Sequence, residues 1–109
     1  MITNSSNWRP PTDVYESEDC IIVKVEIAGM SQERFEITYY KNTLNISGCR
    51  SDEISTKKAF HQLEIGYGEF STSIEINIPI QVDKAEANYQ NGFLIIHLPK
   101  SQPRNIQIK

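Results

Sequence analysis

The sequence is poor in positive charge and contains no glycine-rich phosphate-binding motif. Its 109 residues include 11 Lys and Arg against 14 Asp and Glu, which gives a net charge of −3 at pH 7. A chain without a basic surface cannot neutralise a row of phosphates, so we expect neither nucleic acid nor membrane among its partners. Neither G-x-G-x-x-G nor G-x-x-x-x-G-K-[ST] occurs, which argues against a nucleotide site.

Groups for catalysis or metal binding are equally scarce. The two histidines, His61 and His97, have neither the H-x-x-x-H nor the Cys/His spacing of a metal site. The two cysteines, Cys20 and Cys49, form no C-x-x-C pair, and in a reducing compartment unpaired thiols are favoured over a regulatory disulfide. The sequence therefore predicts no enzyme, no metal and no cofactor.

A secretory leader and a membrane-spanning run are also missing from the sequence. The opening residues, MITNSSN, are neither basic nor apolar, and no window approaches the roughly 18 apolar residues that cross a bilayer. We therefore expect a cytoplasmic protein. With 39% hydrophobic and 23% charged residues, the composition is that of one ordinary globular domain.

Apolar side chains recur at every second position in segment after segment, whereas helical spacing is sustained nowhere. The clearest case is residues 20–27, where every second residue is isoleucine or valine, as in a strand with one buried face. The pattern predicts an all-β fold, an immunoglobulin-like antiparallel β-sandwich of seven to nine strands. Individual strands are expected at residues 20–27, 35–39, 44–48, 60–65, 70–78, 85–89 and 93–98.

Turn signals separate these strands. Lys41-Asn42 joins two of them as a hairpin, and Asn91-Gly92 supplies the positive φ angles that a tight hairpin turn needs. Asn91-Gly92 is the strongest local signal in the chain. Pro79 is expected to end a strand, because proline cannot donate to a ladder of hydrogen bonds.

The segments outside the predicted strands offer little to a core. Residues 49–59 are polar and charged apart from Ile54 and one alanine, which indicates a long loop with at most one short edge strand. Residues 1–12 are expected to form a short N-terminal arm and residues 101–109 a C-terminal tail, around one domain at residues 13–100.

The tail carries an apolar pair in a polar setting. Ile106-Gln107-Ile108 places two β-branched side chains on the same side of an extended segment. Such isoleucines can be exposed without any role, or the tail can fold back as a last strand on its own domain. Alternatively, the segment is a docking peptide that adds to a sheet edge and fills two holes with its side chains. The residues alone leave these interpretations open.

Seven short motifs follow one another along nearly the whole chain, from about Trp8 to Lys109. They are W-x-P-x-x-D-x-x-E at 8–16, V-x-V-x-I-A-G at 23–29, L-x-I-x-G-x-R at 44–50, Y-G-x-F at 67–70, A-x-x-x-N-G-x-L at 87–94, L-P-K at 98–100 and I-x-I at 106–108. The most specific is the fifth, with Asn91, Gly92 and Leu94 in place. In this order and spacing the motifs resemble the α-crystallin domain of small heat-shock proteins.

The chain departs from the family pattern at several points. Ala28 replaces the usual proline before Gly29, and Thr72 stands where many members carry an arginine. The second change puts any arginine-based dimer contact in doubt. The stretch from Phe70 to Pro79 is longer than the common pattern, and the arm before the domain is short.

The resemblance implies an ATP-independent holdase chaperone that binds partly unfolded client proteins and prevents their aggregation. It implies homodimers, in which a strand within the long loop crosses to the partner's sheet with Ile54 as its apolar anchor. Larger oligomers would form when Ile106 and Ile108 dock in a groove between the family's fourth and eighth strands on a neighbouring copy. By motif position, Phe35, Ile37 and Tyr39 are expected on one side of that groove, and Ile74 and Ile76 on the other.

Two other classes of protein share the sandwich. A co-chaperone or scaffold module of the CS-domain type docks on a dedicated chaperone and need not self-assemble, but the I-x-I tail and the long loop favour a small heat-shock protein. A small enzyme or carbohydrate-binding domain would need a polar constellation or an aromatic platform. Tyr39-Tyr40 with Tyr67 or Tyr89 is the candidate for such a platform.

Overall fold

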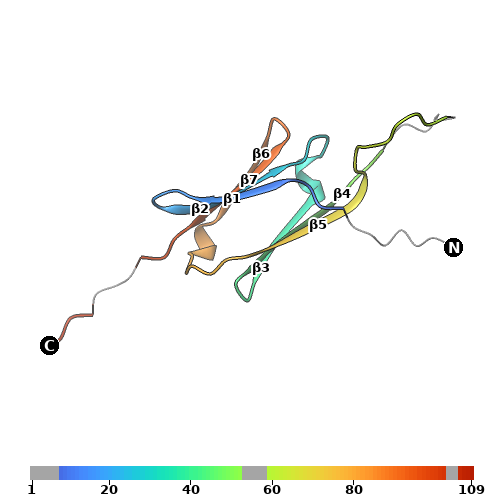
Figure 1. Cartoon of the computed structure of the whole chain (residues 1–109). Helices are drawn as coiled ribbons and strands as arrows, with labels where there is room; N and C mark the ends of the chain where they lie inside the picture. The colour runs from blue at the N-terminus through green and yellow to red at the C-terminus, as the bar shows by residue number, and fades with distance from the viewer. Residues whose placement is uncertain (1–7, 53–58, 103–105) are drawn as a thin grey trace.

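The computed structural model describes residues 8–52, 59–102 and 106–109, which fold as the predicted all-β sandwich (Figure 1). Within these residues there are seven strands and two short 3-10 helices, so the predicted number of strands is confirmed. The strands are β1 Thr12–Glu16, β2 Cys20–Glu26, β3 Phe35–Tyr40, β4 Thr43–Arg50, β5 Gly68–Glu75, β6 Glu86–Gln90 and β7 Phe93–Pro99, and the helices are η1 Gln32–Arg34 and η2 Val82–Lys84.

The hydrophobic core lies between two antiparallel sheets. One sheet has the strand order β1-β2-β7-β6 and the other β3-β4-β5. Because side chains alternate along each strand, every second residue of β2 and β7 points inward, and Val23 pairs with Ile96 in the register of these two strands. The buried apolar side chains form one cluster, made of Ile21, Val23, Val25, Ile27, Leu44, Ile46, Phe70, Ile74, Ile76, Leu94, Ile96 and Leu98.

The two predicted hairpins are confirmed. Lys41 and Asn42 adopt φ angles of 49° and 63° between β3 and β4, and Asn91 and Gly92 adopt 55° and 81° between β6 and β7. Positive φ at both central residues gives a two-residue turn a backbone twist that matches the twist of the two strands it joins. The Asn91-Gly92 turn also holds the adjoining chain, because its Gly92 carbonyl accepts a hydrogen bond from Ile27 N at 2.8 Å.

Two strand predictions need correction. No strand forms at residues 60–65, where Phe60, Leu63 and Ile65 are 62%, 65% and 67% exposed. Their alternation resembles that of a strand, but no strand within the described part of the chain pairs with them. The strand expected at residues 70–78 instead spans Gly68–Glu75, and just beyond its end the backbone N–H of Ile76 donates to Asn42 O in the turn between β3 and β4.

The strand β1 was not predicted from the sequence, and the residues before it pack against the sandwich more closely than expected of a terminal arm. Trp8 forms a parallel bridge with Phe70 at the edge of the three-stranded sheet. Four residues later the chain joins the other sheet, where β1 pairs with β2. The segment therefore crosses from the edge of one sheet to the edge of the other, and Pro10 on the way is fully buried.

Candidate functional site

A groove runs between β3 and β6, the edge strands of the two sheets on one side of the sandwich. On β3, Phe35, Ile37 and Tyr39 are half-buried and pack against the core. The facing strand, β6, contributes Ala87 and Tyr89. Two hollows of about 240 and 530 Å³ follow one another along the groove, and both are lined by Ile37 and Ala87. These two residues therefore mark the seam between the hollows.

The smaller hollow is largely apolar. Its walls include Tyr39 from β3 and Ala85, which precedes β6, and core side chains of β7 such as Ile96 and Leu98 close it. Alanine at the wall leaves space that a larger residue would fill. An aliphatic side chain entering here would therefore exchange water for apolar contacts on several sides.

The larger hollow is bounded by Phe35 and Tyr89, with Leu94 beneath them. The Tyr89 hydroxyl donates to Ile27 O at 2.7 Å and accepts from Met30 N at 3.2 Å. The rings of Phe35 and Tyr89 lie 5.1 Å apart, centroid to centroid. This wall of the groove is thus preformed, because hydrogen bonds and ring contacts hold its aromatic side chains in place.

The expectation for the second wall of the groove was wrong in one respect. Ile74 lies in β5 and Ile76 directly after it, at the opposite edge of the three-stranded sheet, with β4 between them and β3. They are only 8% and 4% exposed, so their alternation is a core signal. Ala85, Ala87 and Tyr89 form that wall instead. Alanine gives little hydrophobic signal in a sequence, although the hairpin at Asn91-Gly92 could have placed this strand at an edge.

The turn signature has a supporting role beside the groove. Asn91 and Gly92 close the β6–β7 hairpin that carries the second wall, and Leu94 lies in the larger hollow and is 2% exposed. At Gly92, a Cβ atom would come within 3.2 Å of the Ala28 Cβ. This close approach fixes the hairpin against the end of β2.

The tail isoleucines are exposed. Ile106 is 91% and Ile108 is 98% exposed, and residues 106–109 form no strand on their own domain (Figure 1). Residues 106–109 therefore do not fold back as a last strand on their own domain. An apolar pair on an exposed segment and a groove with one largely apolar hollow are both left without a partner in the described residues.

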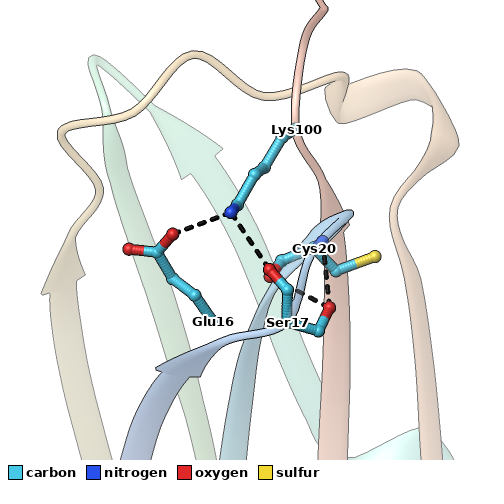
Figure 2. A network of polar contacts seen from close by, with 4 residues as sticks. All are labelled: Glu16, Ser17, Cys20 and Lys100. Carbon is cyan, nitrogen blue, oxygen red and sulfur yellow. Dashed lines mark hydrogen bonds and ion pairs between the residues drawn. The ribbon is translucent and has the colours of Figure 1, made fainter.

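The point where the tail leaves the domain is fixed by Lys100, as Figure 2 shows. Its ammonium group lies 2.8 Å from the carboxylate of Glu16 and donates to Ser17 O at 3.0 Å. The Ser17 hydroxyl in turn accepts from the backbone N–H of Cys20 at 3.1 Å. The backbone of Lys100 also donates to Asp19 O at 2.8 Å. The tail root is therefore tied to the turn between β1 and β2.

A second surface available to a partner is the outer edge of β1. Within the described residues β1 pairs with β2 alone, and Val14 and Tyr15 are 48% and 47% exposed. The limb of the long loop at residues 59–67 also presents apolar side chains to solvent. Ile54, the predicted anchor of this loop, lies outside the described residues.

Other kinds of site can be assessed in the same part of the chain. In residues 8–52, 59–102 and 106–109, no group of three or more His, Cys, Asp or Glu side chains could hold a metal ion. Cys20 and Cys49 are unpaired thiols. No helix in these residues is long and apolar enough to span a membrane.

Comparison with known proteins gives a consistent picture. The model of the Hsp20/alpha crystallin family matches residues 13–109. Heat shock protein 16 of Schizosaccharomyces pombe is 38% identical over 95 residues, which cover 84% of this chain and 66% of that protein. Small heat shock protein C2 of Rickettsia felis is 31% identical over 111 residues, or 98% of this chain and 72% of its own length. The chain thus spans about two thirds of the length of these relatives.

Solved structures agree with the sequence relatives. Heat shock protein 16.0 from Schizosaccharomyces pombe superposes with a TM-score of 0.78 at 34% identity and covers 94% of this chain and 100% of that one. A small heat-shock protein from Xylella fastidiosa reaches a TM-score of 0.79 at 27% identity, with 95% of this chain and 99% of that chain covered.

Proposed function

Because the chain belongs to the Hsp20/alpha crystallin family, we propose that it is an ATP-independent holdase chaperone, which binds partly unfolded proteins and prevents their aggregation. The observation that carries this proposal is a preformed groove, one of whose two hollows is largely apolar, together with a tail whose two isoleucines are almost fully exposed. A groove that an extended tail can fill and leave can also accept an extended apolar segment of an unfolding client.

Tail docking would assemble the protein into larger oligomers. Side chains at alternate positions of an extended segment point the same way and lie about 7 Å apart. Ile106 and Ile108 have this spacing, and the groove offers two hollows separated by the seam at Ile37 and Ala87. Edge backbone groups of β3 and β6 would add hydrogen bonds to the docked tail.

The contact is expected to be weak. Burying two isoleucine side chains contributes about 1.5–3 kcal/mol each, or roughly 3–6 kcal/mol in total. Fixing the backbone of three tail residues costs about 1–2 kcal/mol per residue, which offsets most of that gain. Reversible docking follows, and it lets heating or a competing client free the groove.

The proposed dimer uses the other exposed surface. A loop strand from one copy would pair with the open edge of β1 in a second copy, which removes an exposed edge from both. The exposed Val14 and Tyr15 on β1 and the exposed Leu63 and Ile65 on the loop limb support this arrangement, because burying them needs a partner. Two unpaired cysteines support a reducing, cytoplasmic setting for this activity.

A complex with a client is the expected product of holdase activity. We would heat a thermolabile protein with the purified chain in the absence of nucleotide and analyse the soluble fraction by size-exclusion chromatography. The proposal predicts a soluble complex that contains both proteins. Recovery of the chain alone, with the client in the pellet, would contradict the proposal and favour an adaptor of the CS-domain type.

The role of the tail can be tested separately. Ile106→Ala combined with Ile108→Ala should shift larger assemblies toward dimers in sedimentation velocity. Gln107→Ala is the matched control, because Gln107 points away from the isoleucine face and its substitution should leave the assembly unchanged. An unaltered sedimentation profile of the double variant would exclude tail docking.

A further inference from the structure

Arg50, the last residue of β4, lies where four separate parts of the chain meet. Around its side chain are Trp8 before β1, Ala28 after β2, and Gly66 and Tyr67 before β5. We propose that Arg50 is a positioning residue for the dimer: it clamps the base of the loop at residues 59–67 so that the loop is presented to the β1 edge of a second copy. This inference rests on the loop-exchanged dimer of the proposed function.

The clamp is made first of hydrogen bonds. Arg50 donates from Nε to Gly66 O at 3.0 Å, and its Nη2 donates to the same carbonyl. The remaining arm of the guanidinium donates from Nη1 to Ala28 O at 3.1 Å. One planar group thus ties the loop base to the segment that follows β2. A lysine has a single ammonium centre and cannot reproduce this fork.

Two aromatic rings lie close to the guanidinium. Its Cζ lies 4.5 Å from the ring centroid of Trp8 and 5.4 Å from that of Tyr67. These are distances at which a cation is attracted to the face of a ring. Because Tyr67 belongs to the loop base and Trp8 to the arm, the same cation holds both segments against the end of β4.

Trp8 itself is a fixed support. Its indole Nε1 donates to Gly68 O at 3.2 Å, and its ring lies 5.6 Å from that of Phe70. The packing of Trp8 against the loop base leaves no space for a side chain at Gly66, where a Cβ atom would come within 2.8 Å of the Trp8 ring. Trp8 is therefore held in place by its own contacts, and it packs closely against the backbone of Gly66.

The loop beyond the clamp is exposed. Leu63 and Ile65 are 65% and 67% exposed, and the hydrogen bond from Gln62 to Glu64 stays within the loop. The direction in which this exposed segment points is set by the residues at its base. Fixing Gly66 and Tyr67 therefore limits the directions in which Leu63 and Ile65 can point, and it reduces the entropy lost when a second copy binds them.

The test compares Arg50→Met and Arg50→Lys with the unchanged chain, all in the Ile106→Ala/Ile108→Ala background so that only dimers are measured. Sedimentation equilibrium gives the dimer dissociation constant. Without the clamp the loop base must be ordered when the dimer forms, and ordering one further backbone residue corresponds to about tenfold in the dissociation constant, so Arg50→Met should weaken the dimer by roughly that extent. Arg50→Lys should recover only part of the loss. Arg34→Met is the control, because Arg34 lines the same surface pocket as Arg50, a pocket separate from the groove, but is exposed.

The fluorescence of Trp8, the single tryptophan, reports on the clamp independently of assembly. Its emission should shift to longer wavelength and become more accessible to acrylamide in Arg50→Met, whereas Arg34→Met should leave it unchanged. If Arg50→Met fails to fold, Gly66→Ala replaces it, since the added methyl group pushes the loop base away from Trp8. Gly66→Ala should weaken the dimer similarly.

The outcomes separate this inference from the proposed dimer. An unchanged dissociation constant in a variant whose Trp8 emission has shifted would overturn the clamp and leave the dimer standing. A monomeric parent chain would overturn the dimer, and the clamp with it.

Discussion

Replacing Ala87 by leucine should close the groove without disturbing the fold. Ala87 lies on the edge strand β6, is exposed, and lines both hollows together with Ile37. A leucine side chain at this position projects into the seam between the hollows. It does not enter the core, because Ile96 and Leu98 already close the groove from beneath.

The size of the effect follows from what the leucine excludes. If it keeps one tail isoleucine out of its hollow, about 1.5–3 kcal/mol of burial is lost. This corresponds to roughly tenfold to a hundredfold in the dissociation constant of the tail. The stability of the sandwich should change by no more than about 0.5 kcal/mol, as expected of an exposed site.

Fluorescence anisotropy measures this directly. A labelled peptide of residues 101–109 is titrated with the Ile106→Ala/Ile108→Ala chain, in which the chain's own tails no longer compete for the groove. Ala87→Leu in that background should bind the peptide at least tenfold more weakly. Asn77→Leu adds the same side chain at an exposed position beyond β5 and should bind like the parent. Equal affinity of the Ala87→Leu chain and its parent would refute the groove as the tail's site.

Two further predictions concern the sandwich and the tail root. Thr72 is 4% exposed and its buried hydroxyl has no hydrogen-bond partner among the described residues, so Thr72→Val should stabilise the fold by about 1 kcal/mol and raise Tm by roughly 4–8 °C. A lower Tm in scanning calorimetry would contradict the packing of β5. Lys100→Gln removes the ion pair with Glu16, whose side chain is 51% exposed, and should cost at most about 1 kcal/mol in urea unfolding. That difference should shrink in high salt, and a difference that persists there would indicate that the ion pair is not its source.

The elements that sequence reasoning identified are those with a strong local signal. β2 and β7 have branched aliphatic side chains at every second position, isoleucine and valine in β2 and leucine and isoleucine in β7, because both strands lie inside their sheet and pack on the core. The β6–β7 hairpin follows from Asn91-Gly92, because few residue pairs accept positive φ at both positions. Such features depend on neighbours in the chain and can be read without a structure.

The missed features depend on contacts between distant segments. β1 has four exposed residues out of five and borders a single strand, so its sequence shows no alternation. The loop limb at residues 59–67 shows the reverse case: its apolar residues alternate as in a strand, but in the described part of one chain no other strand pairs with it. At Arg50, the contacts join residues 8, 28 and 66, which are far apart in the sequence and whose meeting no local pattern predicts.

Heat-induced aggregation of a client protein, followed by light scattering, tests the holdase most directly. The client is heated with no addition, with stoichiometric amounts of this chain, and with the chain plus ATP. The proposed function predicts that the chain suppresses scattering and that ATP makes no difference. Unchanged scattering in the presence of the chain, or suppression that requires ATP, would contradict it.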